Sequence, residues 1–186
     1  VLRFLGIFVV LKLAFLGWMG ADGLRMMTAL QLGLVSVVLL AGAVLLAMSL
    51  SWQMVPGERQ RIPVPVLVST FAAGFLIVVA ALFPWNASLI FETGWSCTWA
   101  GVLVAVPTAA VLLYLASRGA PLSYPKLGAS LGAASGLLGL AVLQYHCPQQ
   151  EASHIMLWHG AVVLISVAAG YVLGQAAQYM VRRSGE

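Results

Sequence analysis

Charged residues are scarce in this 186-residue chain, at 8% of the sequence, and only five residues are acidic. A water-soluble domain carries about 25% charged residues, so a chain this apolar faces lipid rather than water. Lipid offers the backbone no hydrogen-bond partners, and only helices or a closed barrel satisfy the backbone internally. The alternating pattern of barrel strands is absent, whereas the hydrophobic residues, 62% of the chain, gather in long runs. We therefore predict an all-α polytopic membrane helix bundle.

The chain also lacks the motifs of common enzymes. It has no glycine-rich phosphate loop, no catalytic triad arrangement and no H-E-x-x-H zinc motif. The few carboxylates stand mostly at the ends of apolar runs and form no pair for proton transfer inside a bundle. The net charge of +4 does not indicate nucleic-acid binding, because the basic residues are scattered at the ends of those runs. We predict no enzyme activity, no resident cofactor and no direct contact with nucleic acid.

Six apolar runs are long enough to cross a bilayer, since about 20 residues span its hydrocarbon layer. We predict spans near residues 2–20, 28–50, 64–84, 97–117, 126–146 and 155–179, forming a single domain over residues 1–186. The first residue is Val1 rather than a methionine. We therefore expect a cytoplasmic segment to precede it in the natural protein.

Lysine and arginine are unequally divided between the two faces of this arrangement. Arg25 is the one basic residue in the first, third and fifth connections, and Lys12 lies inside the first span. Since loops rich in lysine and arginine stay in the cytoplasm, we predict that both termini are cytoplasmic. Lys12 is expected to snorkel, to pair with a polar group or to mark a different span boundary. The basic residues on the predicted cytoplasmic face are Arg3, Arg59, Arg61, Arg118, Lys126, Arg182 and Arg183.

Small residues recur every four positions on two of the predicted spans. Gly128, Gly132 and Gly136 follow this spacing on the fifth span, and Gly170 and Gly174 repeat it on the sixth. Such rows let two helix backbones approach closely in lipid. They indicate close packing inside the bundle, with a homodimer face as the alternative.

The two cysteines, Cys97 and Cys147, fall at the same predicted non-cytoplasmic face. The fourth and fifth helices run inward and back out between them, so the two sulfurs can meet. Three interpretations stay open for the pair. A permanent disulfide would stabilise the fold by roughly 4 kcal/mol on a chain-entropy estimate. The others are a pair that responds to oxidants or metals, and unpaired cysteines that serve only packing.

Imidazole groups lie close to one of these cysteines in the sequence. His146 and His154 flank Cys147, while Glu92 and Glu151 face the same aqueous layer. Thiolate and imidazole are the preferred ligands of zinc and other thiophilic ions, so a transient metal ion is one interpretation. There is no C-x-x-C, however, and adjacent residues such as His146 and Cys147 reach one ion only awkwardly. Hydrogen-bonded anchoring at the interface is the alternative for both histidines.

Two residues inside the predicted spans are further candidates. His159 lies just over one turn into the last span, where an ionisable side chain is costly and therefore a functional candidate. We expect it to form a hydrogen bond to a neighbouring helix, and with His146 and His154 it is also a possible metal or auxiliary residue. Pro107 interrupts the fourth span about ten residues from Cys97, which predicts a hinge or a static kink there.

These features together resemble the NrsF-type negative regulators of sigma factors, over nearly the whole chain. Each motif alone is short, and the combination carries the resemblance. The motifs are Pro56-Gly57, Gly94-Trp95-Ser96-Cys97, a glycine-rich fifth span ending in His146-Cys147-Pro148, His154, and Trp158-His159 before a last span of small residues.

The resemblance implies a six-span anti-sigma factor of the bacterial inner membrane. Such proteins hold an extracytoplasmic-function sigma factor away from RNA polymerase until a stress signal arrives. The paired sensing cysteines of the family correspond to Cys97 and Cys147, which implies a periplasmic oxidant or heavy metal as the signal. The segment expected to contact the sigma factor would precede Val1. Two other classes compete: a small-solute transporter or channel with His159 and Lys12 along its path, and a structural subunit with a permanent disulfide.

Overall fold

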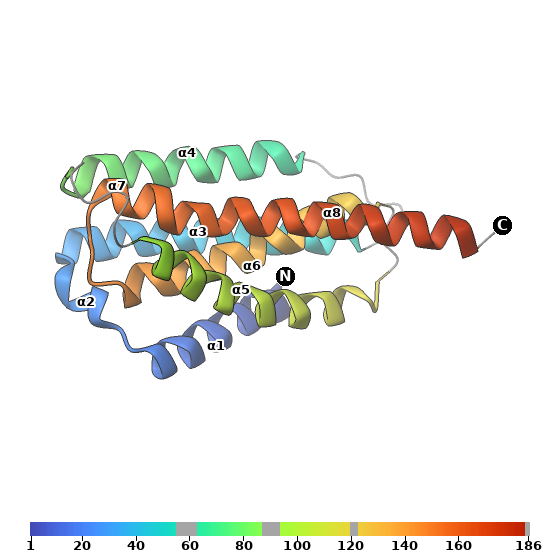
Figure 1. The fold of residues 1–186 in the computed structure, drawn as a ribbon, viewed down its shortest axis with the longest axis horizontal. Helices are drawn as coiled ribbons and strands as arrows, with labels where there is room; N and C mark the ends of the chain where they lie inside the picture. The colour runs from blue at the N-terminus through green and yellow to red at the C-terminus, as the bar shows by residue number, and fades with distance from the viewer. Residues whose placement is uncertain (55–62, 87–93, 120–122, 185–186) are drawn as a thin grey trace.

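A computed structural model of the chain describes residues 1–54, 63–86, 94–119 and 123–184. In these residues the secondary structure is entirely helical (Figure 1). The long helices are α1 (Leu2–Met19), α3 (Ala29–Gln53), α4 (Val64–Leu82), α5 (Gly94–Ala116), α6 (Tyr124–His146) and α8 (Gly160–Ser184). The short ones are α2 (Asp22–Met26), α7 (Ala152–His154) and η1 (Ile155–His159), a turn of π-helix that leads into α8.

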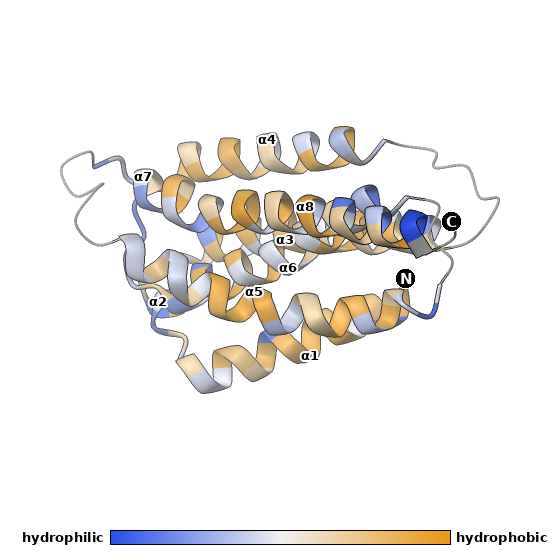
Figure 2. Cartoon of the chain, turned by 45° about the vertical axis from the view of Figure 1, so that its right-hand side comes forward, coloured by the Kyte–Doolittle hydropathy of each residue, from blue (hydrophilic) through white to orange (hydrophobic). Residues whose placement is uncertain are grey.

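Six helical stretches of the described residues are long and apolar enough to cross a membrane, which confirms the predicted helix bundle. The first, second and third run over Leu2–Met19, Ala29–Gln53 and Pro65–Leu82, and the others over Gly94–Ala116, Tyr124–His146 and Ala152–Arg183. In Figure 2 the hydrophobic colour covers the lengths of these helices. Both chain ends lie at one end of the bundle, opposite α2 and α7 (Figure 2). Cys97 lies about one turn inside its helix, because α5 begins at Gly94.

Helix α6 occupies the centre of the bundle. In the 18-residue apolar stretch of α6, 89% is buried inside the protein, whereas the corresponding share for α1 is 6%. It contacts α1, α3, α5 and α8 (Figure 1). The α6 sequence explains this position, because its glycine, alanine and serine residues leave room for helices on several sides.

Closest approach occurs between α6 and α8. A Cβ atom on Gly128 would collide with the carbonyl of Gly170, and one on Gly132 with the carbonyl of Ser166. A Cβ on Gly174 would collide with the carbonyl of Tyr124. The two rows of small residues therefore face each other within one chain. This confirms the prediction of close packing inside the bundle.

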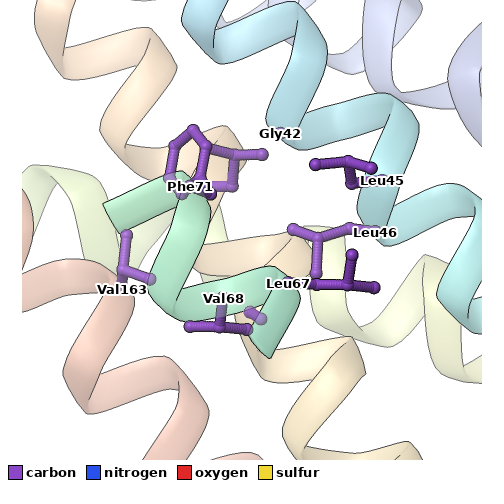
Figure 3. A pocket seen from close by; sticks show the side chains of 9 residues that line it. Gly42, Leu45, Leu46, Leu67, Val68, Phe71 and Val163 are labelled. Atoms are coloured by element: carbon purple, nitrogen blue, oxygen red, sulfur yellow. The ribbon is translucent and has the colours of Figure 1, made fainter. Parts of the chain in front are cut away.

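Helix α4 packs against the outer side of α3. The Phe71 ring lies over Gly42, where an added Cβ would stand 2.5 Å from the ring (Figure 3). Leu46, Leu67 and Val163 line the small apolar cavity beside it. At the far end of the helix, the Gln31 side chain donates a 2.7 Å hydrogen bond to the backbone carbonyl of Leu82, which ties α4 to the start of α3.

Lys12 lies over an aromatic ring inside the bundle, a contact that the sequence did not predict. Its Nζ lies 4.1 Å from the centre of the Tyr145 ring. The Tyr145 hydroxyl makes a 2.8 Å hydrogen bond with Ser36 Oγ. A cation over an aromatic face is stabilised by the ring quadrupole, more so where water is excluded. This contact joins α1 to the carboxyl end of α6.

The surroundings of two glycines, Gly132 on α6 and Gly33 on α3, predict different effects on stability when each is replaced by alanine. Gly132→Ala places a methyl group against the Ser166 carbonyl and should lower the stability by about 1–3 kcal/mol. Gly33→Ala on α3 meets no atom within 4 Å, and it should leave stability unchanged or raised by helix propensity. Thermal unfolding in detergent micelles checks both, and equal midpoints for the two variants would contradict the packing.

Candidate thiol and imidazole site

Two thiols and two imidazoles meet at the end of the bundle that carries α2 and α7. The Sγ atoms of Cys97 and Cys147 lie 3.5 Å apart. Cys147 Sγ lies 3.6 Å from His154 Nε2, and the rings of His154 and His159 meet edge to face with their centres 5.2 Å apart. One potential ligand atom from each of the four residues lies within 4.8 Å of the others. We call this group the thiol–imidazole cluster.

A close contact between α5 and η1 brings Cys97 to the cluster. Gly94 opens α5 against the Trp158 indole, and any side chain there would collide with that ring. Thr98 Oγ1 donates a 3.1 Å hydrogen bond to the Trp158 carbonyl. Cys97 lies between Gly94 and Thr98 in the sequence. Because Gly94 has no side chain, α5 can approach η1 closely enough for the Cys97 sulfur to reach the sulfur of Cys147.

The π turn brings the two histidines together. His154 and His159 are five residues apart, which an α-helix of 3.6 residues per turn would separate by about 140° around its axis. The wider π turn places residues five apart on nearly the same side. Ile155–His159 forms such a turn, so both rings point toward the sulfurs of the cluster.

A set of backbone contacts holds Cys147 where α6 ends. Its amide donates to the Leu143 carbonyl at 2.8 Å, and the chain then turns to extended backbone. The Gln150 side chain donates to the carbonyls of Cys147 and Gln144, at 2.7 Å and 3.2 Å. On the other side, Gly23 lies so close that a Cβ there would stand 2.5 Å from the Cys147 carbonyl. These contacts fix the direction in which the Cys147 thiol leaves the helix.

Burial governs the electrostatics of the cluster. Cys147, His154 and His159 are buried, while Cys97 is half-buried. The hydrogen bond with Cys97 and the desolvation of the thiol both raise the pKa of Cys147. Among the described residues, His154 Nδ1 and both ring nitrogens of His159 have no hydrogen-bond partner. A buried polar atom without a partner costs about 1–3 kcal/mol, so a ligand bound at these nitrogens would stabilise the site.

The remaining candidates from the sequence lie elsewhere. His146 is not part of the cluster, and its Nδ1 lies 3.2 Å from the Gly20 carbonyl, with which it anchors the end of α1. Glu151 accepts a 3.3 Å hydrogen bond from Asn86. Glu92 lies outside the described residues.

Pro107 lies within α5, which continues through it as a helix. The hydrogen bond expected between His159 and a neighbouring helix is not found among the described residues.

Sequence reasoning did not anticipate the pairing of His154 with His159. Helical periodicity separates them, and the wide turn that joins them accompanies the contact between Trp158 and Gly94. The five-residue spacing of two histidines at the start of an apolar span was the available signal. It becomes informative only when a π turn is considered.

The arrangement supports two kinds of chemistry. Two thiols in contact can join as a disulfide after a small movement, since that bond needs sulfurs about 2.0 Å apart. Two sulfurs and two imidazole nitrogens can also ligate a thiophilic cation. Both reactions would tie α5 to the segment that follows α6. The fold and cluster thus define a multi-pass helical membrane protein with two thiols and two imidazoles gathered at one end.

The chain belongs to the NrsF family, described as negative regulator of sigma F, which it matches over residues 2–177. This is a family of sigma-factor regulators and not of enzymes, which confirms both the resemblance and the predicted lack of enzyme activity. No curated protein and no solved structure matches the chain significantly.

The sulfur contact predicts an intramolecular disulfide under oxidation. Reduced protein should accept two alkyl groups on denaturation, and protein treated with diamide should accept none until it is reduced again. Because the chain has only two cysteines, Cys97→Ser or Cys147→Ser should leave one alkylatable thiol in both conditions. Mass spectrometry counts the alkyl groups. Two free thiols after oxidation, or dimers linked between chains, would contradict the proximity of the sulfurs.

Proposed function

We propose that this protein is a membrane-bound anti-sigma factor of the extracytoplasmic-function class. It sequesters its sigma factor at the inner membrane and releases it when a thiol-reactive signal, an oxidant or a heavy metal, reaches Cys97 and Cys147 from the periplasm. Membership of the NrsF family supports the sigma-factor partner. The observation that carries the sensing role is the 3.5 Å contact between the two sulfurs.

Oxidation of this pair is a balanced two-electron step. Each thiol loses its proton to water, the two sulfurs form one bond, and the oxidant accepts two electrons. Cys97 is half-buried and Cys147 is buried, so small thiol reagents gain access through Cys97. Accessible thiols are the ones that oxidants modify selectively.

The charge distribution supports a periplasmic cluster. Arg3 lies at the start of α1, Arg118 just beyond α5 and Lys126 near the start of α6, while Arg182 and Arg183 lie at the end of α8. These helix ends lie at the end of the bundle that carries the chain termini, whereas α2, which contains Arg25, lies at the opposite end (Figure 2). Connections rich in lysine and arginine remain cytoplasmic. In this orientation the cluster faces the periplasm, and the segment that binds the sigma factor lies in the cytoplasm.

Pro107 is the proposed hinge that carries the signal across the membrane. It removes one backbone donor from α5, and Thr108 Oγ1 donates a 2.7 Å hydrogen bond to the Val104 carbonyl beside it. Both features favour bending of a helix. A change at Cys97 therefore moves the far half of α5 and the connection from Arg118 to Lys126, of which residues 120–122 lie outside the described residues.

Release of the sigma factor tests the proposal directly. The full-length natural protein is co-produced with its sigma factor, and sigma factor retained on isolated membranes is measured before and after diamide or Cd²⁺. The wild type should lose its sigma factor, and a variant with both Cys97→Ser and Cys147→Ser should retain it. His146→Ala, at the same end but outside the cluster, should respond as the wild type does. Normal release from the double cysteine variant would refute sensing by this pair.

Substitution of Pro107 separates sensing from transmission. Pro107→Ala restores a continuous hydrogen-bond ladder in α5 and should weaken sigma-factor release, while the cysteines still form their disulfide. Alkylation measures the first step and membrane retention the second. Full release from the Pro107→Ala variant would show that Pro107 is a static kink.

A further inference from the structure

We infer that the thiol–imidazole cluster is a closed, four-ligand site for a borderline or soft divalent cation such as Zn²⁺ or Cd²⁺. Cys97 and Cys147 supply two sulfur ligands, and His154 and His159 supply two nitrogen ligands. This deepens the proposed function, on which its regulatory consequence rests, by naming the chemical class of the signal. Binding of the cation itself is independent of any sigma factor.

The distances suit tetrahedral coordination. Bonds of about 2.3 Å to sulfur and 2.0 Å to nitrogen at tetrahedral angles place neighbouring ligand atoms about 3.3–3.8 Å apart. The two measured separations, 3.5 Å between the sulfurs and 3.6 Å from Cys147 Sγ to His154 Nε2, fall in this range. All four ligand atoms lie within 4.8 Å of one another, so small side-chain adjustments complete the tetrahedron.

The two imidazoles are available as ligands. His159 is fully buried and His154 is 3% exposed. Neither nitrogen of the His159 ring has a hydrogen-bond partner among the described residues. Coordination gives one nitrogen of the His159 ring a partner at a position where water is excluded, and so relieves a desolvation cost. His154 would bind through Nε2, the nitrogen that already lies 3.6 Å from Cys147 Sγ.

Charge balance favours a divalent ion at this place. On binding, each thiol releases one proton to water, and the two thiolates neutralise the two positive charges of the ion. The site is then neutral, which a buried position at the membrane surface requires. Among the described residues no carboxylate belongs to the cluster, so Mg²⁺ and Ca²⁺, which prefer oxygen ligands, are disfavoured.

Four protein ligands leave no open coordination position, as in structural rather than catalytic zinc sites. The ligands come from α5, from the end of α6, from α7 and from η1. A bound ion would therefore clamp α5 to the segment between α6 and α8. The same clamp would follow from oxidation of the two sulfurs, but the histidines take part only in the clamp made by a metal.

Cobalt substitution tests the site on the full-length natural protein, purified in detergent with a phosphine reductant. Co²⁺ should bind once per chain and produce the visible bands of tetrahedral cobalt with thiolate charge transfer, and Zn²⁺ or Cd²⁺ should displace it while Mg²⁺ does not.

His154→Ala and His159→Ala should weaken binding at least about 100-fold, since even groups around a ligand contribute about 10–100-fold. His146→Ala is the matched control and should bind as the wild type does. His159→Cys should restore binding and increase the charge transfer, because it adds a third thiolate.

Each outcome decides between the two proposals. Absence of cobalt binding by the reduced wild type, or an unchanged spectrum and affinity in His159→Ala, would overturn the metal site. If the oxidant still released the sigma factor in that case, the proposed function would stand with an oxidant as its signal. If cobalt and Cd²⁺ bound as expected but neither Cd²⁺ nor an oxidant released the sigma factor, the site would stand and the proposed function would fail.

Discussion

Close backbone contact around α6 is the constraint on which the rest of the structure depends. Lipid provides no hydrophobic force between helices, so dense packing has to hold them together. In α6, Gly132 meets the Ser166 carbonyl of α8, and Gly139 lies so near α5 that a Cβ there would stand 2.6 Å from the Gly101 carbonyl. Gly101 is one helical turn from Cys97. The backbone contact that joins α5 to α6 therefore also determines how far Cys97 lies from the end of α6.

The carboxyl end of α6 connects the cluster to the first helix. Tyr145 carries Lys12 of α1 over its ring, and His146 contacts the Gly20 carbonyl where α1 ends. Cys147, the next residue, enters the cluster. Three consecutive side chains thus join α1 and the thiols through one short piece of backbone. These contacts add to the apolar packing of α1 against α5 and α6.

Hydropathy was sufficient to predict the spans, because the cost of placing backbone and charge in lipid acts on whole segments. The same approach brought Cys97 and Cys147 to one end of the bundle. It did not pair His154 with His159, because their spacing fits no face of an α-helix. That pairing arises from a π turn next to a tertiary contact between Gly94 and Trp158, and such contacts are invisible to local periodicity. The inclusion of His159 depends on this turn, whereas His146 lies at the end of α6 and contacts the Gly20 carbonyl instead.

The origin of the four cluster residues limits how a signal can act. Cys147, His154 and His159 belong to one continuous segment, whereas Cys97 alone comes from α5. With the inferred metal bound, a movement of α5 would remove one sulfur ligand, which would weaken binding at least about 100-fold. A 100-fold difference in affinity shifts a two-state population from about 10% to about 90%. A disulfide has no such partial state, because it either joins the two sulfurs or does not. A metal would therefore produce a response that reverses when the free ion is removed, and an oxidant would produce a response that persists until the disulfide is reduced.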